Sequence, residues 1–350
     1  MKKHSLILFL AAALAAGSFT MASAEEQTAE SPVVVNSPEE ASWWTPVTSI
    51  DFSPKKDVLI ENSDGSLSPM DEAHFEVKQI NDNTWQILSD GDYCYLAAGN
   101  DYAVCIDSGY GAGNLRAFCQ TLTDKPVKYV LNTHYHFDHT ANDAYFDAAY
   151  MSKETVPLAT IPYASFAGIH FPRNYPVVIV KDGDTIDLGG RVLEVFEIPN
   201  HTQGGIVFLD RKNRILFAGD EFIKPKAVTL NCSVEKYAEN MKKMSAVASD
   251  ISTMLCGAGI ITDSSCIDRF LLCADYILQG GEPDSPSEKG SSSYKAPQPV
   301  SVPGKTVYLR HRVRPGDGGA GQTAGKEMVT TTFGGVSITY DKNKIHKEKR

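Results

Sequence analysis

The sequence predicts a mixed α/β domain in which two sheets are flanked by helices. Between residues 71 and 281, short runs rich in Val, Ile, Tyr and Phe alternate loosely with segments that keep helical spacing. Asn, Asp or Gly separates many of these runs. The chain has 350 residues and no internal repeat, which suits one large domain with appendages or two modest domains.

Predicted strands dominate the first half of this region. They cover residues 74–80, 84–88, 93–97, 102–106 and 127–131. A short helix is predicted over 114–122, where three apolar residues share one face. Further short helical pieces are expected at 142–149 and 163–169.

The second half combines strands with two longer helices. The strands are predicted at 177–180, 192–198, 206–210 and 215–218. The helices are predicted over 234–248 and 264–278, and Gly280-Gly281 ends the second one. Apolar residues recur at helical spacing in both, with Met and aromatic side chains in the first and aliphatic and aromatic side chains in the second, so we expect these stripes to pack in the core.

The N-terminus resembles a secretory signal peptide over residues 1–24. Lys2 and Lys3 precede an apolar run, and Ala22-Ser23-Ala24 forms a cleavage site. The run is too short to span a bilayer comfortably, so cleavage is expected to leave no stable membrane insertion. These features predict a secreted or periplasmic protein of bacterial type.

The flanks of the predicted domain are of lower complexity. We expect an irregular leader over 25–70, a linker over 282–299, and a β-rich C-terminal extension over 300–350 with strands at 305–310 and 328–340. The formal net charge is −10, and no dense basic tract is present. Nucleic-acid binding is therefore not expected, because phosphate contacts need clustered Lys and Arg. A small molecule is the expected partner.

Seven cysteines are an odd number for an exported chain. Counting back from the turn at Gly99-Asn100 predicts that Cys94 and Cys105 are cross-strand neighbours. Two interpretations remain open, a disulfide between them or buried free thiols.

A metal site is predicted from the segment 133–139, which reads THYHFDH. His134 and His136 stand two residues apart on an extended segment and therefore point the same way, while Asp138 and His139 follow at the turn. Neutral imidazoles suit zinc and similar ions, and a carboxylate adds charge. Two more polar residues follow later strands, His201 in PNHTQGG and Asp220 in LFAGD.

These pieces occur in an order that resembles the metallo-β-lactamase superfamily, and its glyoxalase II-like branch in particular. The matching segments are VCIDSG, THYHFDH, PNHT and FAGD. The resemblance implies a four-layer αβ/βα sandwich over residues 71–281. It also implies a hydrolase that uses a metal-bound hydroxide to cleave an ester, thioester or lactam-like bond, and the signal-like segment predicts that this hydrolase is exported.

The resemblance assigns a role to each residue of the site. His134, His136 and His201 would hold the first metal, Asp138 and His139 the second, and Asp220 would bridge both. Asp107 of VCIDSG would orient the histidine loop. Asp138 would also orient the attacking hydroxide. The expected cofactor is one or two zinc ions, with other divalent metals as alternatives.

One departure from the family pattern leaves the second metal position open to three interpretations. The family places a last histidine where this chain has Ala258, in MLCGAG. The site could be dinuclear with a water in the gap, could hold one tight metal, or could have lost much of its activity. The last case would make the protein a weakened or non-catalytic metal- or ligand-binding protein on the same fold. Tyr135 and Phe137 are candidates for lining the substrate pocket. Lys224 is either a partner for a substrate carboxylate or part of a solvated loop.

Overall fold

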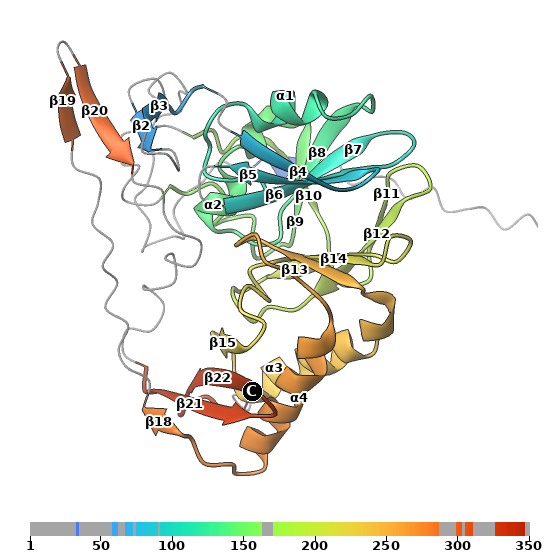
Figure 1. Cartoon of the computed structure of the whole chain (residues 1–350), viewed down its shortest axis with the longest axis vertical. Coiled ribbons are helices and arrows are strands. Elements are labelled where there is room, and N and C mark those ends of the chain that lie inside the picture. The colour runs from blue at the N-terminus through green and yellow to red at the C-terminus, as the bar shows by residue number, and fades with distance from the viewer. Residues whose placement is uncertain are drawn as a thin grey trace, which may run out of the picture. The chain divides into compact units, whose positions relative to one another are not determined.

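The computed structural model describes most of the predicted domain and parts of both flanks. The described residues are 33–34, 58–61, 67–72, 75–89, 92–162, 171–286, 299–302, 305–310 and 326–346. They form an eight-stranded sheet, a six-stranded sheet and two four-stranded sheets (Figure 1). None of the helices in these residues combines the length and hydrophobicity that a membrane span requires.

The eight-stranded sheet begins as an antiparallel meander and continues as a parallel sheet. Its strands in spatial order are β1 (Val33–Val34), β10 (Pro176–Ile179), β9 (Ala148–Met151), β8 (Val127–Leu131), β7 (Ala103–Ile106), β6 (Asp92–Ala98), β5 (Thr84–Ser89) and β4 (Phe75–Asn81). Strands β4 to β7 pair antiparallel, whereas β7, β8, β9 and β10 run parallel. Parallel neighbours need a crossover, which helix α1 (Leu115–Gln120) supplies between β7 and β8.

The six-stranded sheet follows later in the chain. Its strands are, in order, β11 (Thr185–Asp187), β12 (Val192–Glu197), β13 (Ile206–Asp210), β14 (Ile215–Gly219), β16 (Thr253–Cys256) and β17 (Ile261–Thr262). Only β14 and β16 pair in parallel, and helix α3 (Val234–Ser245) lies in the connection between them. Helix α4 (Ser265–Leu278) follows β17.

Side-chain alternation builds a core on both faces of each sheet. On β6, Tyr95 packs into the cluster shared with the six-stranded sheet, including Phe208 and Phe217. Its neighbours Cys94 and Leu96 pack on the opposite face, in the cluster that contains α1 residues. Because α3 and α4 cover the outer face of the second sheet, the layers run helix, sheet, sheet, helix. This confirms the predicted four-layer sandwich.

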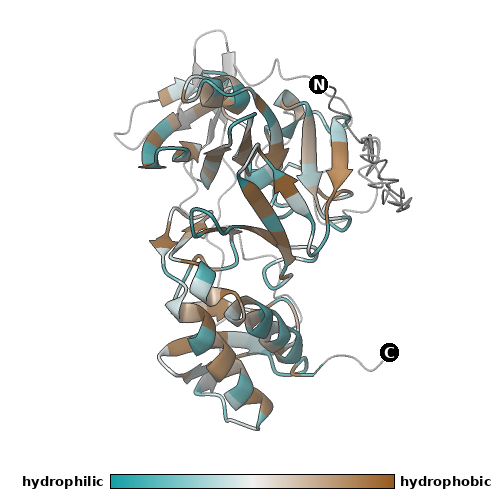
Figure 2. Cartoon of the chain, turned by 90° about the vertical axis from the view of Figure 1, so that its right-hand side faces the viewer, coloured by the Kyte–Doolittle hydropathy of each residue, from teal (hydrophilic) through white to brown (hydrophobic). Residues whose placement is uncertain are grey.

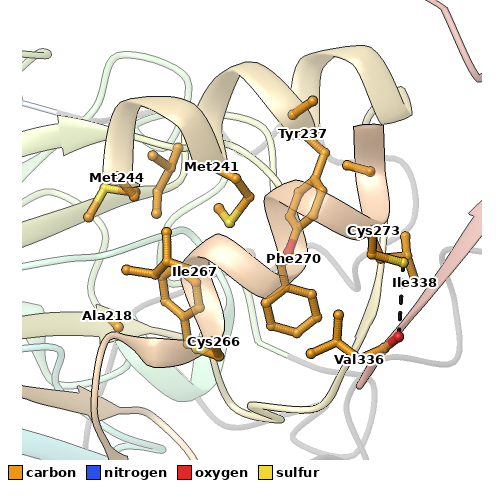
Figure 3. Close-up of a cluster of buried hydrophobic side chains, with 14 of the residues drawn as sticks. Ala218, Tyr237, Met241, Met244, Cys266, Ile267, Phe270, Cys273, Val336 and Ile338 are labelled. Carbon is orange, nitrogen blue, oxygen red and sulfur yellow. Dashed lines mark hydrogen bonds between the residues drawn. The ribbon is translucent and has the colours of Figure 1, made fainter. Parts of the chain in front are cut away.

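Helices α3 and α4 bury the stripes that the sequence predicts. Tyr237 and Met241 of α3 pack with Ile267 and Phe270 of α4 (Figure 3), and all four are at most 1% exposed. The Tyr237 and Phe270 rings meet nearly edge to face, with centroids 6.2 Å apart. Hydrophobic and hydrophilic residues both occur along these helices (Figure 2), as one-sided burial requires.

The C-terminal region contributes strands to both small sheets. In the first, β21 (Met328–Phe333) and β22 (Val336–Asp341) form a hairpin that pairs with β15 (Ala227–Thr229) and β18 (Ser285–Pro286). In the second, β19 (Pro299–Val302) and β20 (Lys305–Arg310) join β2 (Val58–Glu61) and β3 (Leu67–Pro69). Val336, Ile338 and Tyr340 of the hairpin pack into the α3/α4 cluster.

Several local predictions were wrong. The helix predicted over 142–149 is a 3₁₀ turn (Asp143–Tyr145) followed by strand β9, because β9 is held between two strand neighbours. The strand predicted over 328–340 turns back at Gly334-Gly335, both with positive φ. Strands β11, β16 and β17 were not predicted. The helical piece predicted at 163–169 lies outside the described residues.

The predicted cross-strand pairing of Cys94 and Cys105 was also wrong. Leu96, and not Cys94, is the register partner of Cys105. The thiol of Cys105 contacts that of Cys119 on α1, with 3.2 Å between the two sulfur atoms. All seven cysteines are free, so the buried-thiol interpretation describes this structure.

Candidate metal centre

The histidine loop leaves the end of β8 and is anchored by Asp107. The Asp107 carboxylate accepts hydrogen bonds from the Thr133 backbone N–H (2.7 Å) and the Thr133 hydroxyl (2.8 Å). It also lies 2.9 Å from Nδ1 of His139. Asp107 has φ +59°, a left-handed conformation that Asp tolerates better than most residues. One buried carboxylate therefore ties both ends of the loop together.

Three imidazoles converge beside this anchor. Nδ1 of His136 lies 3.0 Å from Nε2 of His134 and 3.1 Å from Nε2 of His201. The other nitrogen of His134 faces the Thr133 hydroxyl at 3.0 Å, which leaves Nε2 directed inward. Three ring nitrogens aimed at one another are the arrangement in which a cation accepts all three lone pairs.

Burial keeps these histidines neutral. It lowers the pKa of His136 to about 3, with a smaller lowering from His201. Burial also lowers the pKa of His134 and His201 below the ordinary value. Neutral imidazole is the form that binds a metal, so the three side chains are ready to act as ligands near pH 7.

Asp220 lies between this group and His139. One carboxylate oxygen is 3.5 Å from Nε2 of His139, and the other is 3.6 Å from Nε2 of His201. Donor atoms of His134, His139 and Asp220 all lie within 4.8 Å of one another. Nε2 of His139 and Oδ1 of Asp220 are buried without any hydrogen-bond partner. Such orphaned polar atoms are costly unless a ligand satisfies them, and a cation would satisfy both.

Charge couples His139 to its neighbours. Burial alone would lower its pKa, but the carboxylates of Asp107 and Asp220 raise the pKa well above the ordinary value. Burial raises the pKa of Asp220, but the charge and contact of His139 and the charge of His201 together lower this pKa below the ordinary value. Without a metal, His139 is therefore protonated, with Nδ1 in contact with Asp107 and Nε2 only at ion-pair distance from Asp220. A cation must displace that proton, which makes binding pH-dependent.

The remaining predicted residues fall into different environments. Asp138 lies in the first turn of helix α2 (Phe137–Thr140), and its carboxylate lies within 4.8 Å of a ring nitrogen of His139. Tyr135 is 7% exposed, with its ring 5.0 Å from that of His136. Phe137 is fully buried against Phe171, so it packs behind the loop. Lys224 is exposed to solvent.

Three buried carboxyl residues of the site were not predicted. Asp143 accepts hydrogen bonds from Ser108 and from Asn132, which also donates to the backbone oxygen of His139. Glu221 accepts from the backbone N–H of His201 at 3.2 Å. Asp92 lies close to Asp138 and His139, so that one possible metal-binding atom of each residue lies within 4.8 Å of the other two. No sequence spacing identified them, although Glu221 directly follows the predicted Asp220.

Comparisons with known proteins find one matching family and several similar chains. The family described as the metallo-beta-lactamase superfamily matches residues 90–252. The chain is 29% identical over 157 residues to human "Acyl-coenzyme A thioesterase MBLAC2", covering 36% of this chain and 56% of that protein. It is 27% identical over 131 residues to the "Probable polyketide biosynthesis zinc-dependent hydrolase BaeB" of Bacillus velezensis, covering 37% and 54%. A solved "Metallo-beta-lactamase from Pontibacter korlensis" aligns at 19% identity with a TM-score of 0.45, over 58% of this chain and 99% of that one. The chain thus spans little more than half the length of these two curated relatives.

Proposed function

The chain belongs to the metallo-beta-lactamase superfamily, and from this premise we propose that it is an exported zinc-dependent hydrolase of thioesters or related esters. The observation that carries the proposal is the convergence of His134, His136 and His201 next to the orphaned atoms of His139 and Asp220. Burying Nε2 of His139 and Oδ1 of Asp220 without hydrogen-bond partners costs free energy unless a cation satisfies both atoms.

The residues divide into two ligand groups. His134, His136 and His201 would hold one ion, and Asp138 and His139 a second, with Asp220 facing both groups. A zinc-class ion supplies two things when bound, a water of lowered pKa and polarisation of the carbonyl under attack. No side-chain nucleophile is then required.

The chain's own residues position the ligand nitrogens and transfer protons. Asp107 and Thr133 hold the loop in one conformation, so the ligand nitrogens need little reorganisation. The Asp138 carboxylate lies in the site, 7% exposed, where it can take a proton from water and return it to the leaving group. Burial of the site excludes bulk water and strengthens each of these electrostatic contacts.

The choice of a thioester or ester rests on the relatives. One is named an acyl-coenzyme A thioesterase and another a zinc-dependent hydrolase. A lactam-like bond stays within the same chemistry, because all three reactions attack a carbonyl carbon and expel a leaving group. Export is proposed from the signal-like segment at residues 1–24.

The test measures metal content and turnover of the same purified protein. The substrate panel contains an acyl-coenzyme A, lactoyl-glutathione, an aryl ester, a lactone and a chromogenic cephalosporin. We expect thioester hydrolysis that chelation abolishes, zinc restores, and His136→Ala removes. The exposed Lys212→Ala serves as the control variant. Stoichiometric zinc with no turnover of any substrate would overturn the hydrolase and support the alternative drawn from Ala258, a non-catalytic metal-binding protein.

A further inference from the structure

We propose that Asp92 is a further metal ligand, whose carboxylate completes the second metal position with Asp138 and His139 in place of a side chain from position 258. The inference rests on the proposed metal-dependent function and goes beyond its ligand set. It assigns the two positions different chemistry, histidine-rich in one and carboxylate-rich in the other.

The first argument is the position of Asp92. It is the first residue of β6 and is 7% exposed. Its carboxylate, that of Asp138 and a ring nitrogen of His139 all lie within 4.8 Å of one another. A side-chain hydrogen bond joins Asp92 and Asp138. Two buried carboxylates this close repel unless a proton or a cation lies with them.

The second argument is the unsatisfied chemistry beside this pair. Nε2 of His139 is buried without a hydrogen-bond partner, although its Nδ1 contacts Asp107 at 2.9 Å. The orphaned Oδ1 of Asp220 lies 3.5 Å from that same Nε2. A cation placed among Asp92, Asp138, His139 and Asp220 would satisfy the orphaned atoms and neutralise the carboxylates together.

The third argument explains why the ligand comes from β6. The loop that carries Ala258 is hydrogen-bonded to β5 and to β6, the strand that begins at Asp92. Tyr93 donates its N–H to the Gly257 oxygen at 2.9 Å, and the Gln86 amide donates to the Gly259 oxygen at 3.3 Å. Asp92 is therefore next to this loop although 165 positions separate it from Gly257 in the sequence.

The loop itself has no room for a ligand at Gly257. A Cβ at that position would lie 2.4 Å from Oδ1 of Asp220 and 2.8 Å from Cε1 of His139. At Ala258 the side chain is a methyl group, which cannot bind a metal. Asp92, on the strand β6 next to this loop, instead has a carboxylate close to Asp138 and His139.

This donor set predicts which ions bind. Three carboxylates and one imidazole suit zinc but also accept harder ions such as manganese, whereas three imidazoles favour zinc-class ions. The protein loaded with both metals is expected to keep zinc at the histidine-rich position and to exchange manganese at the other.

The experiment counts metals and does not depend on turnover. Full-length mature protein is loaded with zinc or manganese, dialysed, and measured by inductively coupled plasma mass spectrometry. We compare wild type with Asp92→Asn, Asp92→Ala and the double variant Asp92→Ala/Ala258→His. Asp210→Asn is the matched control, since it also removes a buried carboxylate, which pairs with Arg191 and belongs to none of the clusters of possible metal ligands among the described residues. Circular dichroism checks that each variant is folded.

We expect two ions per chain in wild type and in the control, one in both Asp92 variants, and two again in the double variant. Cobalt(II) spectra should lose one set of d–d bands in Asp92→Asn, and second-site affinity should fall at least 10-fold. Two ions with unchanged affinity in Asp92→Asn, or a single ion in wild type, would overturn the proposal. An Asp92-dependent second ion without any hydrolysis would refute the proposed function and leave this inference standing.

Discussion

Replacing Asp107 with Asn is expected to weaken zinc binding through the loop that Asp107 holds. The carboxylate contacts the Thr133 N–H, the Thr133 hydroxyl and His139 at 2.7, 2.8 and 2.9 Å, and it is 2% exposed. Asn also tolerates the left-handed backbone that this position adopts, at φ +59°. The substitution therefore changes the hydrogen bonding and keeps the backbone.

The expected loss of stability depends on which hydrogen bonds remain after Asp107→Asn. One side-chain oxygen remains to accept the Thr133 N–H, and the Thr133 hydroxyl can rotate to accept from the new amide. The bond to His139 is lost outright, because the amide nitrogen cannot accept from Nδ1–H. A hydrogen bond to a charged group is worth about 1.5–3 kcal/mol, so we expect a loss of about 2–3 kcal/mol in the free energy of unfolding. Zinc affinity should fall about 10–100-fold, as for other residues that orient a ligand.

Two measurements and one control separate these effects. Urea unfolding of the metal-free protein gives the stability, and competition with a chromophoric chelator gives the zinc affinity. The control is Asp210→Asn, which breaks the buried contact between Asp210 and the Arg191 guanidinium (2.7 Å). It should lower stability and leave zinc affinity unchanged. If Asp107→Asn behaves in the same way, Asp107 does not orient the ligands and the reasoning fails.

Three further predictions follow from packing, titration and ligand binding. Phe270→Ala should lower the unfolding free energy by about 3–5 kcal/mol in urea, because the ring is 1% exposed between α3 and α4. Burial raises the pKa of Asp143 to about 8, despite hydrogen bonds from three donors that lower it. A folded-state pKa above the unfolded value means that this group's stabilisation is complete at acid pH and is lost as pH rises to about 8. The stability of Asp143→Asn relative to wild type should therefore increase by up to about 1.4 kcal/mol per pH unit between pH 5 and 8 in urea melts; a pH-independent difference would contradict the shift. Zinc at about 100 times its Kd should stabilise the folded chain by about 2.7 kcal/mol and raise Tm, and calorimetry of His136→Ala should show no such rise.

Much of the scaffold could be predicted from the sequence because its strands are short and strongly patterned. Val127–Leu131 is an apolar run that ends directly before the histidine loop, and the structure has β8 there. The stripes of α3 and α4 were likewise visible from helical spacing. The resemblance to the family also followed from motif order, and the family model matches residues 90–252.

Other elements depended on partners far away in the chain. Residues 148–151 could have continued a helix, but pairing with β8 and β10 makes them strand β9. Cys105 was placed opposite Cys94 by counting from a turn, and the actual register shifts that pairing by two residues. A local pattern does not contain the hydrogen bonds that a strand makes with its neighbours.

The candidate site divides in the same way. The sequence alone determines the types of metal-binding side chain and their order along the segment. His134 and His136 share one side of an extended segment, and Asp138 and His139 follow at its turn. Only the folded chain brings Asp92 next to Asp138, because that contact depends on how β6 lies beside the histidine loop. The electrostatic state of His139 likewise depends on Asp107 and Asp220, which folding places around it. Motif spacing thus identifies which atoms can bind a metal, and three-dimensional packing decides which of them share one ion.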